Sequence, residues 1–326
     1  MKGLALAEAY YDVHGKPMIQ TLFPDYQERI AVGLVGQGSE CFGFDDVLST
    51  DHDFGPSFCL WLTTEDYQKI GYELQKAYDQ LPQTFMGFEA RVESAESGGR
   101  VGVHEIGTFY RNQIGSSDIP SRFLEWLQIP EFRLATVTNG RIFHDPLGDF
   151  SRIRNGLLDF YPEDIRLKKM AARAVVIGQS GQYNYARSMC RNETVAAHLA
   201  ISEFIQNTIS LIFLMNKKYT PFYKWMHRAL QDLPILGDLS EPLRELSLTS
   251  LNPAAWENSD KKAMLTQLNR QDRIVEQIEE ICKKLKQQLQ ITGLTNSDDD
   301  FLTIHAGQIM ARISDSRIRS IHVMEG

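Results

Sequence analysis

The hydrophobic pattern of the chain changes near its middle, and this change most constrains what the chain can fold into. Up to about residue 158, short β-branched apolar runs alternate with helical segments. From Pro162 onward the helical period dominates, and no alternating strand pattern interrupts it. We therefore predict an α+β fold, with a mixed sheet and helices in residues 1–158 and an all-α helical bundle in residues 159–326.

The first part of the chain contains several strand and helix signals. Ile30–Val35 is apolar, β-branched and short, which predicts a buried strand, and a second strand is expected to start at Asp51 and run to Leu62. Thr63 followed by acidic residues is typical of a helix start, and that helix is expected to end at Pro82. Further strands are expected over 85–93 and 100–106, with a hairpin over 132–143 that turns at Asn139-Gly140.

The second part of the chain consists of helical signals joined by short loops. Helices are expected over 163–179, over 193–216, from Thr220-Pro221 to about 233, and from Ser259-Asp260 to about Leu289. Residues 178–188 are expected to form a loop between two of them. The apolar seam of the last helix is too short for a coiled coil, which favours packing within its own domain and leaves a homodimer open.

The stretch GSECFGFDDVLSTDHDFG carries two aspartates one residue apart, Asp51 and Asp53. On a strand, alternate side chains point to the same face, so these two carboxylates would project together. Their mutual repulsion needs a compensating charge, and Mg²⁺ is commonly held by one or two carboxylates together with substrate phosphates. An EF-hand calcium loop would need flanking helices and a terminal Glu, and neither is evident.

A glycine-rich turn precedes these aspartates. Gly36 and Gly38 allow a tight turn and a close approach to a bulky ligand. Ser39 is expected at a helix start, where free N–H groups favour a phosphate. Gly38 and Ser39 are therefore predicted to contact the triphosphate of a nucleotide beside the aspartate pair.

An apolar strand, a Gly-Ser turn and an Asp-x-Asp pair about a dozen residues later resemble the nucleotidyltransferase superfamily of the DNA polymerase β type. GLVGQGSECFGFDDVLSTDHDFG, NGRIFHDPLG and YTPFYKWMHRAL are more closely similar to an uncharacterised bacterial family, a domain of unknown function. The resemblance implies a small catalytic domain followed by a helical domain, as in aminoglycoside nucleotidyltransferases. It also implies that Mg²⁺ and ATP, or another nucleoside triphosphate, are used to transfer a nucleoside monophosphate to a hydroxyl group.

Two further carboxylates are candidates for this chemistry. Members of the superfamily often use a third metal-binding acid on a later strand, and Glu105 is the nearest acid here, although Gly102 occupies the position where an acid is often found. Glu203 lies in a strongly apolar helix, where burial would disfavour its charged form and make it a better base for the acceptor hydroxyl. The alternative for Glu203 is a structural pair with Arg173 or Arg187.

The segment NKKYTPFYKWMHRAL places cations among aromatic residues. Lys224 is expected in the first turn of its helix, where the helix dipole disfavours a cation unless an anion is bound nearby. We therefore predict that Lys224 contacts a phosphate and that Tyr223 stacks on the nucleotide base.

Composition limits the remaining alternatives. The net charge of −8 and the isoelectric point of about 5.5 disfavour nucleic acid as a partner. Four scattered cysteines suggest neither a zinc site nor a disulfide framework, and no leader or membrane-spanning run is recognised, so a cytoplasmic protein without a membrane partner is expected. The acceptor is expected to be a small hydroxylated molecule or a protein side chain. A non-catalytic nucleotide-binding sensor or interaction module is the alternative function.

Overall fold

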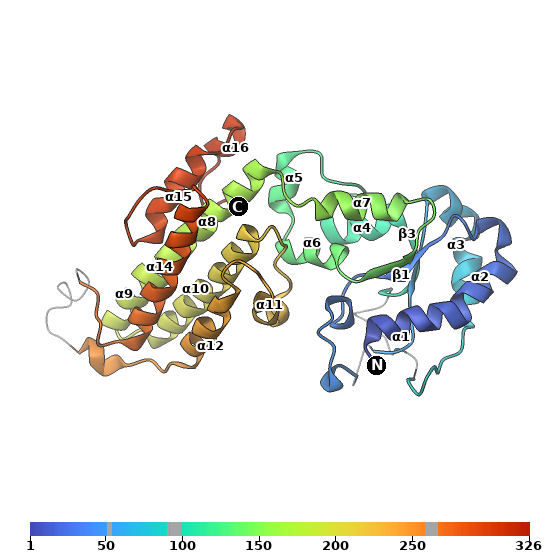
Figure 1. Ribbon diagram of the computed structural model, residues 1–326, viewed down its shortest axis with the longest axis horizontal. Coiled ribbons are helices and arrows are strands. Elements are labelled where there is room, and N and C mark those ends of the chain that lie inside the picture. The colour runs from blue at the N-terminus through green and yellow to red at the C-terminus, as the bar shows by residue number, and fades with distance from the viewer. Residues whose placement is uncertain (51–53, 90, 92–98, 258–266) are drawn as a thin grey trace. The chain divides into compact units, whose positions relative to one another are not determined.

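The computed structural model describes residues 1–326 except 51–53, 90, 92–98 and 258–266 (Figure 1). The chain forms two compact units. The first unit comprises Met1–Ser121 and Ile129–Phe160, and the second, the helical unit, comprises Arg122–Gln128 and Tyr161–Gly326. The sequence had placed a single boundary after residue 158. The structure ends the first unit at Phe160 and assigns the short segment 122–128 to the helical unit.

A four-stranded mixed sheet forms the centre of the first unit, in the order β3-β2-β1-β4. β1 (Ala31–Leu34) is antiparallel to both β2 (Cys59–Leu62) and β4 (Arg141–His144), and β2 is parallel to β3 (Gly102–Glu105). All residues of β1 and β2 are buried, as their continuous apolar runs predict. The expected α+β class is confirmed: a mixed sheet with helices accompanies a separate, helical part of the chain.

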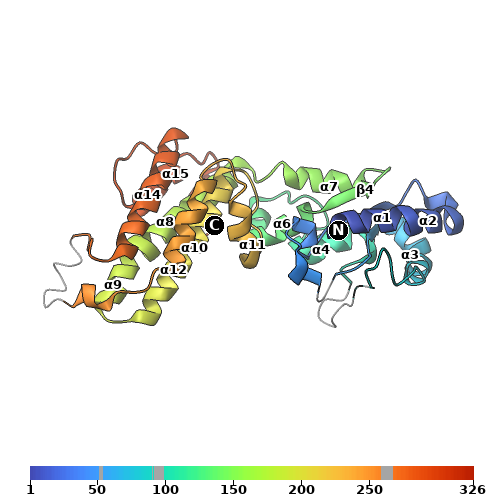
Figure 2. The same ribbon diagram turned by 60° about the horizontal axis from the view of Figure 1, so that its bottom comes forward.

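Helices cover both faces of this sheet, and alternation along β2 directs side chains to each of them. Leu60 and Leu62 belong to a core cluster with residues of the N-terminal helices and of α3. Trp61 faces the other way and stacks on Phe150 of α7, with ring centroids 4.0 Å apart. Figure 2 shows α1, α2 and α3 at one end of the unit.

The helices and turns of the unit are α1 (Gly3–Tyr10), η1 (Tyr11–Gly15), α2 (Lys16–Leu22), η2 (Pro24–Tyr26), η3 (Glu40–Phe42), η4 (Val47–Thr50), α3 (Thr64–Asp79), α4 (Ile106–Ile114), α6 (Glu131–Thr138) and α7 (Asp149–Leu158).

The start of α3 shows how local sequence fixes an element. The Thr63 hydroxyl accepts a hydrogen bond from the Asp66 N–H, as the sequence predicted for a capped helix. The carboxylate of Asp66 is itself buried and accepts two hydrogen bonds from the Arg29 guanidinium, at 2.9 and 3.1 Å. These contacts tie the first turn of α3 to the segment that leads into β1.

Three strand predictions in this unit are wrong. The expected hairpin over 132–143 is helix α6 followed by β4, and residues 134–138 are all buried, a continuous run that cannot be assigned to a strand or a buried helix from periodicity. The expected strand over 85–93 is reduced to an isolated bridge between Phe85 and Phe88 in its described part. The strand expected from residue 51 starts at Cys59 among the described residues.

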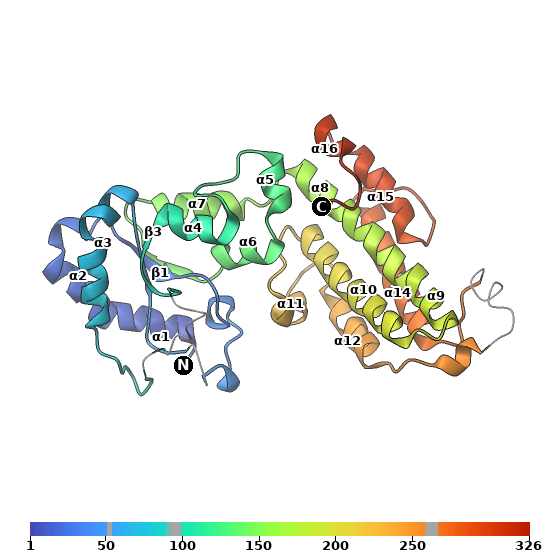
Figure 3. The same cartoon turned by 180° about the vertical axis from the view of Figure 1, so that it is seen from behind.

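The helical unit is built around long helices that lie side by side (Figure 3). α8 (Glu163–Ile177) packs against α10 (Thr194–Met215) and α15 (Leu302–Ala311), and α14 (Arg273–Ile291) contributes a buried face that includes Ile278 and Leu285. Its other elements are α5 (Phe123–Gln128), η5 (Gly178–Tyr185), α9 (Ala186–Cys190), α11 (Tyr223–Leu230), η6 (Gly237–Leu239), α12 (Ser240–Leu248), η7 (Pro253–Trp256) and α16 (Ser316–Ser320).

The loop predicted over residues 178–188 is wrong. Residues 178–185 form a π-helical segment that joins α8 to α9 in one continuous helix. A Cβ atom on Gly181 would lie 2.3 Å from the Phe204 ring, and one on Gly178 would lie 2.5 Å from the Thr303 hydroxyl oxygen. The glycines therefore allow neighbouring helices to pack closely at this point. This tertiary packing overrides the usual preference of glycine for turns.

Two helix starts also differ from expectation. α11 begins at Tyr223 rather than at Thr220-Pro221. α14 begins at Arg273, where the carboxylate of Asp272 accepts from the Ile274 N–H, whereas the expected start at residues 259–260 lies outside the described residues.

Helix α10 is the one described helix that is long and apolar enough to cross a membrane by length and composition. Of its most apolar window, 61% is buried inside the structure. That burial is typical of the core helix of a folded domain.

Candidate functional site

The turn that follows β1 is the most distinctive feature of the first unit. Gly36 and Gly38 both have φ of +134°, a backbone conformation that L side chains rarely adopt. Ser39 directly precedes the 3₁₀ turn η3 and accepts hydrogen bonds at its carbonyl oxygen from the N–H groups of Phe42 and Phe44. The glycine-rich segment thus forms a tight turn at the end of a buried strand.

Asn139 holds this turn from a distant part of the chain. Its side-chain oxygen accepts a hydrogen bond from the Gly36 N–H at 2.9 Å, and its side-chain nitrogen donates to the Gly36 carbonyl oxygen at 2.7 Å. The adjacent Gly140 has φ of +63°, and a Cβ atom there would lie 1.9 Å from the Leu34 carbonyl oxygen. The Asn-Gly pair that suggested a hairpin therefore clamps the glycine turn instead.

A buried ion pair lies against the same turn. Arg91 Nη1 is 2.9 Å from Glu40 Oε1, and the two side chains are only 4% and 5% exposed. A Cβ atom on Gly38 would lie 2.5 Å from both carboxylate oxygens of Glu40. Burial alone would lower the pKa of Arg91, but the charge of Glu40 outweighs it, so this pKa is raised and the guanidinium stays charged. Sequence reasoning missed this pair because its members are far apart in the chain.

A cleft of about 300 Å³ opens beside the turn. Its walls combine the glycine turn, the start and end of β3, and one side of α4. Most of the lining is polar, and Arg100 supplies a cation. The lining residues are Val35, Gly36, Gln37, Tyr67, Gly99, Arg100, Val103, His104, Glu105, Thr108, Phe109, Asn112 and Gln113. A polar cleft with an arginine at a glycine turn can accept an anionic ligand such as a phosphate chain, although Glu105 in the same lining carries the opposite charge.

His104 in this cleft is held in its neutral form. Burial lowers the pKa of His104 to about 4. Its Nε2 atom is buried and has no hydrogen-bond partner among the described residues, and its ring lies 5.9 Å from the Phe109 ring. No sequence motif had singled out this residue.

Glu105 has a structural role in this arrangement. Its carboxylate accepts hydrogen bonds from the N–H groups of Gly107, at 3.1 Å, and Thr108, at 2.6 Å, which caps the start of α4. The Thr64 hydroxyl donates to the same group at 2.8 Å. Burial would raise the pKa of Glu105, but these hydrogen bonds together lower it. Both oxygens cap the start of α4, and the metal role expected for Glu105 stays a prediction.

The two aspartates at the centre of the magnesium prediction, Asp51 and Asp53, lie outside the described residues. Among the residues that the structure does describe, no three His, Cys, Asp or Glu side chains form a group that could hold a metal ion. The magnesium site therefore stays a prediction from the sequence.

Glu203 is not buried, contrary to expectation. It lies on the exposed side of α10, where its carboxylate accepts from the Asn207 side-chain nitrogen at 3.0 Å. The expected alternative is also wrong, because Arg173 donates to Ser210 and to the Gly326 carbonyl oxygen, and Arg187 lies over the Tyr183 ring. The apolar sequence around Glu203 is buried on the other side of the helix.

Lys224 and Tyr223 lie in the first turn of α11 in the helical unit, whereas Gly38 and Ser39 belong to the first unit. Both side chains are exposed. Lys224 Nζ is 4.6 Å from the centre of the Trp225 ring, and the rings of Tyr223 and Phe222 are 4.6 Å apart. Lys224 and Tyr223 thus lie beside aromatic side chains, and their contacts with a phosphate and a nucleotide base stay predictions.

Comparison with known proteins finds a family match over part of the chain. Residues 126–226 match the family described as Domain of unknown function (DUF4037). The prediction of an uncharacterised domain-of-unknown-function family is confirmed over that range. No curated protein matches the chain. The crystal structure of a nucleotidyltransferase-like protein from Exiguobacterium sibiricum 255-15 is similar at 12% sequence identity, covering 91% of this chain and 90% of that one. Its TM-score is 0.36, too low to support an argument about fold or function.

Proposed function

We propose that this chain, whose residues 126–226 match an uncharacterised family, is a magnesium-dependent nucleotidyltransferase. It would transfer a nucleoside monophosphate from a nucleoside triphosphate, with ATP the first choice, to a hydroxyl group of a small molecule or protein. The observation that carries the proposal is the glycine turn at the end of buried β1, which opens on a polar cleft containing Arg100. The Asp-x-Asp sequence follows this turn by about a dozen residues.

The described residues supply binding and orientation in this proposal. Arg100 would neutralise part of the phosphate charge, and Asn139 would hold the turn that approaches the phosphates. Asp51 and Asp53 would hold Mg²⁺, which would supply further positive charge to the phosphates when bound.

The reaction itself is an in-line displacement at the α-phosphorus. The acceptor oxygen forms a bond to this phosphorus, the bond to the β-phosphate oxygen breaks, and pyrophosphate leaves. The hydroxyl proton must pass to a base. Glu203 remains a candidate for contacting the acceptor, although it lacks the burial from which the base role was argued.

Pyrophosphate release from ATP and magnesium, measured with and without a metabolite mixture as acceptor, tests this proposal. We expect the double variant Asp51→Asn, Asp53→Asn to lose at least about 100-fold of the activity, since the charge that stabilises the transferred phosphate would be gone. Asp46→Asn is the matched control, because it removes one charge from the same segment and Asp46 caps its own turn through Leu48 and Ser49. Unchanged release by the double variant would contradict the metal assignment.

A non-catalytic nucleotide-binding module is the second candidate function. It is favoured by one observation: Glu105, the expected third acid, is used as a helix cap. Such a module would show a higher melting temperature with ATP and magnesium, since binding at 100 times Kd stabilises a fold by about 2.7 kcal/mol, but it would release no pyrophosphate. An enzyme would show both effects, and the absence of both would exclude both functions.

A further inference from the structure

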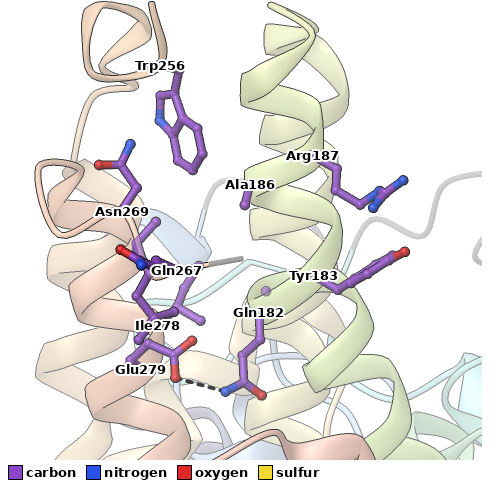
Figure 4. A pocket seen from close by; sticks show the side chains of 12 residues that line it. Gln182, Tyr183, Ala186, Arg187, Trp256, Gln267, Asn269, Ile278 and Glu279 are labelled. Carbon is purple, nitrogen blue, oxygen red and sulfur yellow. Dashed lines mark hydrogen bonds between the residues drawn. The ribbon is translucent and has the colours of Figure 1, made fainter. Parts of the chain in front are cut away.

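The helical unit contains a pocket that the proposed nucleotidyl transfer does not use. It has a volume of about 180 Å³. Its walls come from the π-helical segment η5 and the start of α9 on one side, and from α14, Trp256 and residues 267–269 on the other (Figure 4). The side chains that matter for its chemistry are those of Gln182, Trp256, Asn269, Ile278 and Glu279.

A carboxylate lines this pocket without a balancing cation. Glu279 is half-buried and accepts one hydrogen bond, from the Gln182 side-chain nitrogen at 2.9 Å. No Lys or Arg of the described chain forms an ion pair with it. Burial raises the pKa of Glu279, and the nearby negative charge of Asp300 raises it further. Among the described residues, the charged carboxylate therefore has no cation in ion-pair contact.

The charged groups around the pocket do not supply that counter-ion. Lys286 forms an ion pair with Asp300. Arg187 lies over the Tyr183 ring at 4.7 Å, and Figure 4 shows both side chains extending away from Glu279. Arg270 lowers the pKa of Glu279, but only as a weak, longer-range influence, and its side chain is exposed.

The walls of the pocket are fixed by hydrogen bonds. Trp256 donates its indole N–H to the buried Asp272 carboxylate at 2.7 Å, and the Tyr185 hydroxyl donates to the same oxygen at 2.7 Å. The Asn269 side-chain nitrogen donates to the Ala255 carbonyl oxygen at 2.9 Å. A ligand would therefore enter a preformed site, with little cost for ordering its walls. The Trp256 ring and Ile278 provide apolar contact area, and an aromatic ring also favours a cation.

We propose that this pocket binds a small molecule that carries a protonated amine, with Glu279 as its counter-ion and Trp256 as its apolar wall. Gln182 orients the carboxylate through their shared hydrogen bond, and π-helical segments of this kind are frequent at functional sites. The proposal is independent of nucleotidyl transfer, because every residue in it belongs to the helical unit.

Ligand-observed NMR and calorimetry on the full chain test this pocket. The probes are ethanolamine, putrescine and glucosamine, each paired with a neutral counterpart of similar size: ethylene glycol, 1,4-butanediol and glucose. We expect at least one amine to bind while its neutral counterpart does not. Glu279→Gln should weaken that binding by at least about tenfold, since it removes the charge and keeps the shape.

Two further variants control this test. Glu276→Gln removes a charge from an exposed position on the same helix and should leave binding unchanged. Ala186→Leu keeps Glu279 but fills the pocket and should also abolish binding. The proposal is overturned if no amine binds, if the neutral counterparts bind equally well, or if Glu279→Gln binds like the wild type.

Discussion

Each unit contains a polar side chain that joins distant parts of the chain, and the two contacts differ in kind. In the first unit, the half-buried Asn139 side chain contacts both polar backbone groups of Gly36. In the helical unit, Tyr185 and Trp256 donate to the side chain of Asp272, which joins two helical segments. The first arrangement fixes the conformation of one turn, and the second fixes how whole elements pack. Substitutions should therefore act on local geometry in the first unit and on packing in the helical unit.

The largest effect is expected at Gly140 in the first unit. Gly140→Ala should lower the free energy of unfolding by more than about 3 kcal/mol, because its Cβ would meet the Leu34 carbonyl oxygen at 1.9 Å. Gly148→Ala is the matched control, since Gly148 also has positive φ but has nothing within 4 Å of a Cβ atom, and it should cost about 1 kcal/mol. Urea unfolding measures both. Equal costs would show that the close approach to β1 does not limit the turn.

Asp272 should have the next largest effect, in the helical unit. Asp272→Ala leaves the Tyr185 hydroxyl and the Trp256 indole without their acceptor and removes the cap of α14, so a loss of about 3 kcal/mol is expected. Asp272→Asn keeps an acceptor oxygen and should cost less. Hydrogen exchange followed residue by residue would show where the protein opens. If Asp272→Ala also increased hydrogen exchange throughout the first unit, the expectation that its effect is confined to the helical unit would be contradicted.

The third effect is a pH dependence that arises in the first unit. The pKa of His104 is about 4 in the fold, against 6.5 as its ordinary value, so the unfolded chain binds the proton first. The stability linked to neutral His104 is complete above pH 6.5 and is lost as the pH falls toward 4, by about 3 kcal/mol. His104→Gln should remove this part of the pH dependence in urea titrations at pH 7 and pH 4. If His104→Gln and the wild type had the same pH profile of stability, His104 would not be the source of this pH dependence.

The smallest effect distinguishes the two roles considered for Glu105. As a helix cap, Glu105→Gln should lower the free energy of unfolding by about 1 kcal/mol while pyrophosphate release persists. Glu65→Gln is the control, because its exposed pair with Lys69 is expected to contribute little to stability. If Glu105→Gln lost pyrophosphate release but kept its stability, the predicted metal role of Glu105 would be supported instead.

Sequence reasoning succeeded where a signal was local. The buried strand β1, the glycine turn after it and the capped start of α3 each depend on neighbouring residues, so hydrophobic pattern and capping chemistry were sufficient. The change from mixed structure to helices near residue 160 was also visible, because the period of the apolar residues changes there.

The parts that only the tertiary structure decided depend on distant partners. Asn139 and Gly36 are 103 positions apart, and nothing near Asn139-Gly140 indicates that it clamps a turn rather than closing a hairpin. The apolar surroundings of Glu203 did not reveal which side of α10 is buried. Gly181 lies in a helix rather than a loop, at a point where the Phe204 ring packs closely against it. Local pattern sets the period of an element, whereas long-range packing decides which face is buried and which polar groups meet.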